Sequence, residues 1–227
     1  MDMTGRYDRN MGSLTEAQQR TLARSSVLVL GCGGLGGYVI EYLARVGVGH
    51  IAAADGDVFQ PSNLNRQLLS TEENLGMNKA LAGKARVRAI NSAVDFAAID
   101  FPVTEENAEG LMRGRDAVID CLDHPGAKLL CARAAGAAGV PFIHGAIAGW
   151  SLRVHTVLPG DDAMEWLCAS GGGTEGLTGN LSFTAAACAA LEAAEAVKLL
   201  LGMDGLTAGR LIEADLLTMR FEEIGLR

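Results

Sequence analysis

The sequence predicts an α/β protein with a doubly wound, Rossmann-like sheet that is mostly parallel and has antiparallel strands in its C-terminal part. Two observations lead to this prediction. From Ser25 onward, short β-branched runs alternate with Ala- and Leu-rich stretches of helical length, the pattern of a sheet covered by helices on both faces. A glycine-rich turn from Gly31 to Gly36 joins the first predicted strand to the first predicted helix.

Predicted strands recur along the whole chain. Ser26 to Leu30 has the continuous apolar run of a buried strand, and residues 152–158 (LRVHTVL) alternate like a strand with one wet face. The last two predicted strands are expected to pair and close the sheet. In order, the predicted strands are residues 26–30, 50–54, 94–99, 116–121, 141–144, 152–158, 210–215 and 219–224.

Helices are predicted between these strands. The first follows the glycine-rich turn and runs to about Val46, where Gly47 and Gly49 stop it. The others are predicted at residues 77–90, 125–138 and about 181–201. We expect a single domain over residues 1–227, with a helical N-terminal arm at residues 1–24. Residues 159–179 lack periodicity and are predicted to form a long mobile loop.

Charge and hydropathy exclude some function classes. The net charge of −8, without a run of Lys and Arg, argues against nucleic-acid binding. The apolar stretch from Ala185 to Leu201 is interrupted by Glu192, Glu195 and Lys198, so no membrane span is expected. The N-terminus does not resemble a secretory signal, and we therefore expect a cytoplasmic protein.

The five cysteines stand singly, and the sequence has no CxxC pair. Neither a disulfide framework nor a zinc site is expected from this spacing. For each cysteine, a small buried apolar residue is a better interpretation than a redox or nucleophilic group.

The glycine-rich turn matches a nucleotide-binding motif in the required context, after a strand and before a helix. Glycines at Gly31, Gly33, Gly34 and Gly36 let backbone N–H groups approach a phosphate, and the helix N-terminus adds partial positive charge. Asp55, just after the second predicted strand, lies where a carboxylate can accept hydrogen bonds from ribose hydroxyls. Taken alone, the motif favours a site for NAD or FAD. Alternatively, the turn only packs the helix against the strand and binds no ligand.

Polar residues after Asp55 indicate a polyphosphate ligand. The segment DGDVFQPSNLNRQLLSTEENLGMNK places its polar side chains beyond the carboxyl end of a strand, where ligands bind in open α/β sheets. Arg66 and Lys79 can bracket a polyphosphate, although each alone could be a surface cation. The polar residues in question are Asp55, Asp57, Asn63, Asn65, Arg66, Gln67 and Lys79.

A second acidic pair, Asp120 and Asp123, follows the fourth predicted strand. Carboxylate oxygens there suit a Mg²⁺ ion that bridges phosphates. Alternatively, one of them caps the helix that begins at Pro125. Taken together, the cations and carboxylates favour attack at a nucleotide phosphate over hydride transfer.

These motifs resemble the ThiF/MoeB/HesA family, which shares its adenylation domain with the ubiquitin-activating enzymes. The resemblance covers nearly the whole chain, and several separate blocks in order are more specific than any one. The blocks are RYDRN from Arg6, GCGGLG from Gly31, DGDVFQPSNLNRQ from Asp55, GMNK from Gly76, DCLDH from Asp120, HGAIAG from His144, and EAVKLL from Glu195.

The resemblance implies an ATP site, with no zinc. The glycines assigned to ATP are Gly31, Gly33, Gly34 and Gly36, and Asp55, with Asp57 beside it, is assigned to the ribose. The residues assigned to the triphosphate are Asn63, Arg66, Gln67 and Lys79. Asp123 is assigned to Mg²⁺, and Arg9 to the site of a neighbouring subunit, so that a homodimer is expected.

The implied reaction adenylates a ubiquitin-like sulfur-carrier protein that ends in Gly-Gly. Its terminal carboxylate attacks the α-phosphate of ATP and pyrophosphate leaves. The carboxylate is already ionised at pH 7, so no general base is required. Positioning and charge neutralisation by Arg9, Arg66, Lys79 and Mg²⁺ would supply most of the acceleration. The thiamine and molybdopterin pathways are both open.

The chain also departs from the family pattern. It lacks the two CxxC pairs that bind zinc in many relatives, and His124 stands where the family usually has Asn. Some relatives use a loop cysteine as a nucleophile, and Cys168 is the candidate here. Acidic neighbours such as Glu165 are expected to raise the pKa of its thiol and to disfavour that role.

Three alternative functions stay open at this point. An NAD-dependent oxidoreductase would need a second, substrate-binding domain, for which little chain remains. A non-catalytic scaffold could keep the fold and bind a partner. An adenylyltransferase could also act on a different acceptor, such as a tRNA or a peptide.

Overall fold

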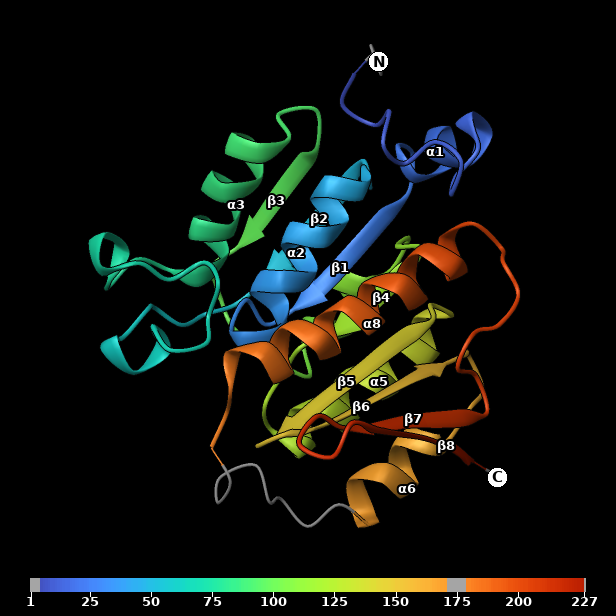
Figure 1. The fold of residues 1–227 in the computed structure, drawn as a ribbon. Coiled ribbons are helices and arrows are strands. Elements are labelled where there is room, and N and C mark those ends of the chain that lie inside the picture. The colour runs from blue at the N-terminus through green and yellow to red at the C-terminus, as the bar shows by residue number, and fades with distance from the viewer. Residues whose placement is uncertain (1–4, 171–178, 227) are drawn as a thin grey trace.

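The computed structural model describes residues 5–170 and 179–226. They fold around an eight-stranded sheet with the order β3-β2-β1-β4-β5-β6-β7-β8 (Figure 1). The strands are β1 Ser26–Leu30, β2 His50–Ala54, β3 Asp95–Ile99, β4 Ala117–Asp120, β5 Phe142–Ala148, β6 Ser151–Val157, β7 Arg210–Asp215 and β8 Arg220–Gly225.

Strand pairing confirms the predicted fold class. The pairs β3–β2, β2–β1, β1–β4 and β4–β5 are parallel. The pairs β5–β6, β6–β7 and β7–β8 are antiparallel. Because β1 lies between β2 and β4, the strand order reverses there, and ligands of open α/β sheets bind at the carboxyl ends of strands at such a point.

Helices cover both faces of the sheet. In Figure 1, α2 and α8 lie in front of the sheet and α5 lies behind it. The larger apolar core lies under α2, α3 and α8, and a second core lies under α4, α5 and α6. The helices are α1 Glu16–Leu22, α2 Gly34–Val46, α3 Lys79–Ile90, α4 Ala108–Met112, α5 Pro125–Ala138, α6 Ala163–Ser170 and α8 Ser182–Leu200, with 3₁₀ turns η1 Pro61–Asn63 and η2 Glu72–Asn74.

The predicted element boundaries agree with the structure to within about two residues at most positions. Gly47 ends α2 in a left-handed conformation with φ of 96°, as its position after the last helical residue predicts. The main difference is β5, which continues to Ala148, four residues beyond the predicted end. The extra residues pair with β6 across a tight hairpin, a tertiary contact that the short apolar run did not reveal.

The predicted loop at residues 159–179 is wrong over α6. Ala163 and Met164 are buried, and Met164 belongs to the core beneath α5. Arg133 on α5 donates to Glu165 with 2.7 Å between Nε and Oε1. Packing and this ion pair stabilise a helix whose own sequence has weak periodicity. Residues 171–178 of the predicted loop lie outside the described residues.

The N-terminal arm is tied to the core before the first strand begins. Tyr7 is buried, and its hydroxyl accepts a hydrogen bond from Nδ2 of Asn91 at 2.8 Å. The predicted helix in this arm is the short α1, which begins with a capping box between Thr15 and Gln18. Residues 1–4 lie outside the described part.

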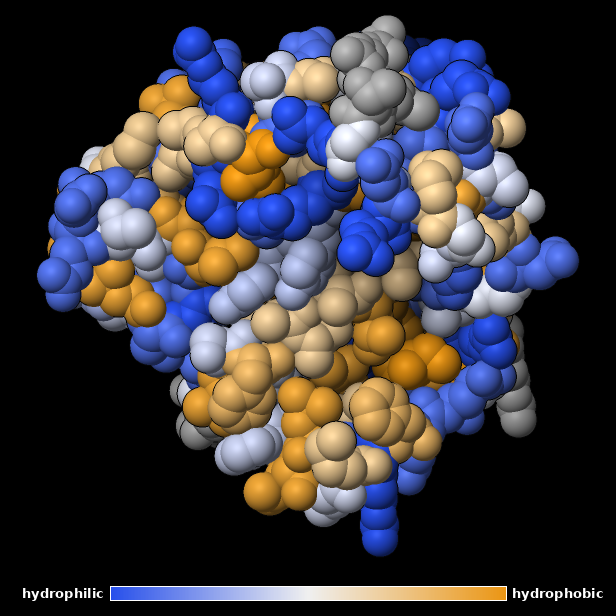
Figure 2. Space-filling model, turned by 45° about the horizontal axis from the view of Figure 1, so that its top comes forward, coloured by the Kyte–Doolittle hydropathy of each residue, from blue (hydrophilic) through white to orange (hydrophobic). Residues whose placement is uncertain are grey.

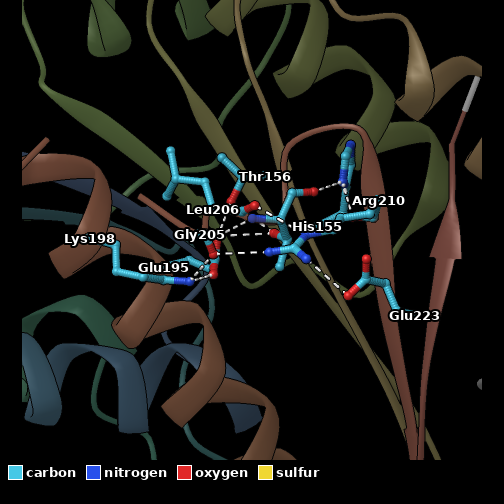
Figure 3. Close-up of polar contacts among 9 residues, drawn as sticks. His155, Thr156, Glu195, Lys198, Gly205, Leu206, Arg210 and Glu223 are labelled. Carbon is cyan, nitrogen blue, oxygen red and sulfur yellow. Dashed lines mark hydrogen bonds and ion pairs between the residues drawn. The ribbon is translucent and has the colours of Figure 1, made fainter. Parts of the chain in front are cut away.

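A polar network fixes the C-terminal end of α8 to β6 (Figure 3). Oε2 of Glu195 accepts hydrogen bonds from Thr156 Oγ1 at 2.7 Å and from the N–H of Thr207 at 2.8 Å. Lys198 donates to Glu195 and to the carbonyl oxygen of Gly205. Burial would raise the pKa of Glu195, but these hydrogen bonds outweigh it and lower the pKa. The network therefore holds a charged carboxylate inside the fold and fixes the position of α8.

No described helix combines the length and apolar character needed to cross a bilayer. Hydrophobic residues nevertheless reach the surface, and Figure 2 shows them gathered most densely in the lower part of one face. Exposed apolar patches of this kind are typical of contact surfaces.

Glu192 on α8 is a buried carboxyl group without a hydrogen-bond partner among the described residues. It packs so closely on Gly145 that a Cβ atom there would overlap the carboxyl group. Burial raises its pKa well above the ordinary value, the charge of Asp120 raises it further, and Lys128 opposes both. We infer that Glu192 is protonated in the folded protein.

Replacing Glu192 with Gln should therefore flatten the pH dependence of stability. A carboxyl whose folded pKa is raised stabilises the fold fully below the unfolded pKa, and this contribution is lost as the pH rises toward the folded pKa. Glu192→Gln does not titrate, so relative to wild type it should gain about 1–3 kcal/mol between pH 5 and pH 8. Urea unfolding at both pH values measures the difference.

The control is Glu222→Gln, because Glu222 is exposed on β8. This variant should follow the wild-type pH dependence. If Glu192→Gln also follows it, Glu192 is ionised in the fold and the assignment is wrong.

Candidate active site

A cavity of about 710 Å³ lies at the carboxyl edge of the sheet, at the reversal between β1 and β4. It brings together most of the residues predicted from the sequence. Those that line it are Gly31, Gly33, Gly34, Asp55, Asp57, Arg66, Gln67, Lys79 and Asp123. Gly36, Asn63 and Arg9 do not line it.

The glycine-rich turn needs glycine for packing as well as for access. Gly31 has φ of 86°, and a Cβ atom on it would lie 2.8 Å from the carbonyl oxygen of Cys121. A Cβ atom on Gly36 would overlap the carbonyl oxygen of Gly31. These two glycines therefore allow the close approach of turn, helix and β4. Gly36 acts by packing and not by lining the cavity.

Gly33 and Gly34 open the N-terminus of α2 to the cavity. Gly33 is the N-cap residue and makes no side-chain capping hydrogen bond. The first N–H groups of α2 are thus directed at the cavity without a capping side chain, the arrangement that binds phosphate in this class of turn.

Asp55 is fixed in place by backbone N–H groups. Its Oδ2 accepts from the N–H of Cys32 at 2.7 Å, and its Oδ1 accepts from the N–H of Asp57 at 2.8 Å. A carboxylate has about four lone-pair sites, so two remain for a ligand hydroxyl. The hydrogen bond from Cys32 links Asp55, at the end of β2, to the glycine-rich turn.

Lys79 is largely buried at the start of α3, with its Nζ 3.1 Å from Oδ2 of the exposed Asp57. Asn78, the N-cap residue of α3, donates through Nδ2 to the carbonyl oxygens of Asp55 at 2.9 Å and Asp57 at 3.2 Å. Asn78 therefore holds α3 against the loop after β2. Sequence reasoning missed this role, although the Asn before a predicted helix was a signal for a cap.

Arg66 and Gln67 lie above the N-terminus of α2. Nη1 of Arg66 donates to the carbonyl oxygen of Ser62 at 2.9 Å, which holds the guanidinium beside the cavity. Gln67 is buried, and its Oε1 has no hydrogen-bond partner among the described residues. A ligand donor would satisfy this oxygen. Asn63 instead accepts from the N–H of Gln60 at 2.9 Å, so its predicted ligand role stays a prediction.

Asp120 is not available as a metal ligand, contrary to the interpretation of the acidic pair. Its buried Oδ2 lies 3.1 Å from Lys128 Nζ and 2.8 Å from His144 Nδ1. Burial would raise the pKa of Asp120, but the charge of Lys128 and the hydrogen bond from His144 outweigh it and lower the pKa. Burial and the Lys128 charge lower the pKa of His144. A neutral His144 thus donates to a charged Asp120.

His124, and not an aspartate, caps α5. Its Nδ1 accepts from the N–H of Gly126 at 3.2 Å. The predicted cap by Asp120 or Asp123 is therefore wrong. Asp123 is exposed at the cavity wall, and no side chain in the described ranges forms a hydrogen bond with its carboxylate. An exposed carboxylate at this place fits a divalent cation.

Comparison with known proteins identifies the family of the chain. The sequence matches the ThiF family over residues 7–227. The chain belongs to the ThiF family. It is 33% identical to the SAMP-activating enzyme E1 of Haloferax volcanii, over 98% of this chain and 85% of that protein. It is 35% identical to the sulfur carrier protein adenylyltransferase of Thermus thermophilus, over 93% of this chain and 82% of that protein.

Other ThiF-family relatives are longer than this chain. It covers 62% of the sulfur carrier protein ThiS adenylyltransferase of Bacillus subtilis, to which it is 35% identical over 88% of its own length. Among solved structures, E. coli MccB with AMPCPP and MccA has a TM-score of 0.85 at 22% identity, over 100% of this chain and 73% of that chain. This structural likeness confirms the fold, and the family match confirms the resemblance seen in the motifs.

Membership of the ThiF family decides against the dehydrogenase alternative, because the named relatives are adenylyltransferases and activating enzymes. The glycine-rich turn alone could not make this distinction. The residues after it, from Asp55 to Lys79, carried the distinguishing signal.

Cys168 has the environment of an ordinary partly buried thiol. Its Sγ donates to the carbonyl oxygen of Pro125 at 3.6 Å, and it does not line the cavity. Burial is the main cause that raises its pKa, and the charge of Asp120 adds to this. The expected rise in the thiol pKa is confirmed, but its chief cause is burial, since Glu165 forms an ion pair with Arg133. The described residues contain no group of three metal-ligating side chains, and the absence of zinc stays a prediction.

The packing role of Gly36 can be separated from access to the cavity. Gly36→Ala should lower the free energy of unfolding by about 1–3 kcal/mol or more, because the added methyl group overlaps the Gly31 carbonyl oxygen. The matched control is Gly34→Ala, whose Cβ would lie 3.9 Å from its nearest neighbour, the Cβ of Ala185. Urea unfolding of both variants compares them. Equal stabilities would show that the turn tolerates a side chain at Gly36.

Proposed function

We propose that the chain is an ATP-dependent adenylyltransferase that activates the C-terminal glycine carboxylate of a ubiquitin-like sulfur-carrier protein and releases pyrophosphate. One observation carries the proposal: a single cavity gathers the glycine-rich turn, two cations and an exposed carboxylate. The names of the ThiF-family relatives support the same chemistry. We treat residues 1–227 as one adenylation domain.

Strand order supports one direction for the proposed nucleotide. Across the carboxyl edge, the end of β2 with Asp55 is followed by the glycine-rich turn after β1 and then by Asp123 after β4. With the ribose at Asp55, the phosphates would lie on the N-terminus of α2. Hydrogen-bond donors in a fixed position stabilise developing charge without reorganisation, and this is the main contribution expected of the protein.

The cations have distinct roles in this proposal. Arg66 presents a planar fork that fits phosphate oxygens, whereas Lys79 acts as a point charge. Lys79 already forms an ion pair with the exposed Asp57, so the triphosphate would compete with Asp57 for the Lys79 ammonium group. Asp123 would hold Mg²⁺, which neutralises phosphate charge when it is bound. The attacking carboxylate is ionised at neutral pH and needs no base.

The acceptor is proposed to be a protein. The net charge of −8 disfavours a tRNA acceptor. Exposed Trp150, in the hairpin turn after β5, and Phe183, at the start of α8, have ring centroids 4.9 Å apart and offer apolar surface to a protein partner. The thiamine and molybdopterin pathways remain alternatives, and the cytoplasmic location expected from the sequence fits the use of ATP.

ATP–pyrophosphate exchange with candidate Gly-Gly-ended carriers tests the reaction. We expect exchange that depends on the carrier and falls by at least about 10²-fold in Arg66→Ala and in Asp123→Ala, the scale of losing one preorganised electrostatic group. The matched control is Arg20→Ala, because Arg20 lies exposed on α1. Exchange that survives both changes would show that the site is misassigned. Exchange with a peptide or tRNA alone would identify a different acceptor.

Arg9 is proposed to act across a homodimer. It is exposed on the N-terminal arm and does not line the cavity of its own chain. A second copy of the chain could bring Arg9 to the cavity, and this would give two shared sites in a symmetric dimer.

Mixing two inactive variants tests this arrangement. Arg9→Ala and Asp123→Ala chains, refolded or exchanged together, should recover up to about a quarter of wild-type exchange, because half of the dimers are mixed and each has one complete site. Light scattering confirms the dimer. Failure to recover activity in folded, mixed dimers would contradict a role for Arg9 in the neighbouring site.

A further inference from the structure

Arg66 lines the cavity with a positive charge that no carboxylate pairs with in the described part of the chain. Lys79, the other Lys or Arg in the cavity wall, pairs with Asp57. Arg66 instead donates through Nη1 to two neutral oxygens, the carbonyl oxygen of Ser62 at 2.9 Å and Oδ1 of Asn65 at 3.0 Å. The charge of Arg66 therefore remains available to an anion in the cavity.

These two hydrogen bonds decide which edge of the Arg66 guanidinium can bind a ligand. A guanidinium carries five N–H groups, two on each terminal nitrogen and one on Nε. Two acceptors occupy both hydrogens of Nη1, so the edge between Nη1 and Nη2 is closed to a second pair of oxygens. The edge formed by Nε and Nη2 makes no hydrogen bond within residues 5–170 and 179–226. This edge can still bind two oxygens of one anionic group.

The same edge binds carboxylates elsewhere in the molecule. Arg133 holds Glu165 through Nε and Nη2, and both distances are 2.7 Å. Arg86 holds Glu41 in the same way, at 2.8 Å from Nε and 2.9 Å from Nη2. A phosphate group also presents two oxygens to a planar fork, so the open edge of Arg66 is suited to a phosphate.

Asn65 can direct Arg66 because its own amide is held in one orientation. Its Nδ2 donates to the backbone oxygen of Asn180 at 3.2 Å, just before the start of α8. The amide oxygen must then face Arg66, since the reversed amide would place donor against donor at Nη1 and acceptor against acceptor at Asn180. Asn65 thus joins the Arg66 guanidinium to the start of α8.

The aliphatic part of Arg66 is also confined. A Cβ atom on Gly34 would lie 4.0 Å from Cγ of Arg66 and 3.9 Å from the Cβ of Ala185 on α8. The Arg66 side chain therefore lies close over the first turn of α2. Ser62, in the 3₁₀ turn η1, holds Nη1 through its backbone oxygen. Both ends of the side chain are thus placed beside the α2 N-terminus, where a phosphate is favoured.

We propose that Asn65 is a positioning residue for the adenylation site. Together with the carbonyl oxygen of Ser62, it holds Nη1 of Arg66 so that the guanidinium turns its Nε/Nη2 edge to a phosphate of the nucleotide. This inference rests on the proposed function and adds the atoms through which Arg66 binds. An arginine held in advance loses less rotamer freedom when the phosphate binds, and its charge is already oriented.

The Nε–H resonance of Arg66 reports the binding edge directly. It is assigned by its loss in Arg66→Lys, and AMPCPP with Mg²⁺ serves as the ligand. We expect AMPCPP to shift this resonance and to slow its exchange with water, because a phosphate oxygen accepts from Nε. The shift at saturation should be smaller in Asn65→Ala. An unchanged Nε–H resonance in wild-type protein saturated with AMPCPP would overturn the inference.

A double-mutant cycle on AMPCPP affinity shows whether Asn65 acts through Arg66. In calorimetry, Asn65→Ala should raise Kd about fivefold, the scale of ordering one long side chain on binding. Arg66→Ala should raise Kd at least about tenfold, the effect of losing hydrogen bonds from a charged group. The double variant should match Arg66→Ala within about twofold, because Asn65 then has no guanidinium to position. Further weakening in the double variant would show a structural role for Asn65 and contradict the proposal.

The control is Glu73→Ala, because Glu73 is exposed on η2 in the same connecting segment and this variant should bind AMPCPP like wild type. Thermal unfolding checks that each variant folds. If Asn65→Ala does not, Asn65→Leu takes its place, since it removes both hydrogen bonds at similar volume. If wild-type protein binds no AMPCPP, the proposed function and this inference both fail. If AMPCPP binds and Arg66→Ala leaves its affinity unchanged, the nucleotide site stands and the roles of Arg66 and Asn65 are wrong.

Discussion

The buried contact between Asp120 and Lys128 is the constraint on which the active-site side of the fold depends. It joins the end of β4 to α5, and the hydrogen bond from His144 adds β5. Lys128 also donates to the carbonyl oxygen of Gly145, so one ammonium group bridges two strands. Removing one partner of such a group leaves an uncompensated buried charge, which is far more costly than a lost surface ion pair. The cavity floor is therefore rigid where β4 ends.

This constraint separates the carboxylates of the site into different roles. Asp120 is buried and neutralised by Lys128, and so it supports the fold. Asp55 accepts hydrogen bonds from two backbone N–H groups and orders the loop after β2. Asp57 is exposed beside Lys79, and Asp123 is exposed at the cavity wall. Four aspartates thus differ in their accessibility to a ligand. Only the exposed ones can accept a cation or give up a paired lysine to a phosphate.

Much of the fold was predictable because its signals are local. Apolar runs such as Ser26–Leu30 and the glycine after α2 report backbone conformation within a few residues. The helix α6 was missed because its stability comes from contacts with α5, among them Arg133 with Glu165. The end of β5 was missed for a related reason. Its last residues are strand because β6 folds back on them, and a hairpin partner is not visible in the run itself.

The sequence by itself determined the fold class, the family motifs and most residues of the cavity, because a glycine-rich turn between strand and helix and the polar segment after Asp55 are local patterns. Only the tertiary structure decided that Asp120 is paired with Lys128, that His124 caps α5, that Gly36 acts by packing, and that Ile147 and Asn180 line one cavity. Those facts depend on which strands end first and which side chains meet across the sheet. Distances between strands far apart in sequence set them, and no short pattern of residues encodes such distances.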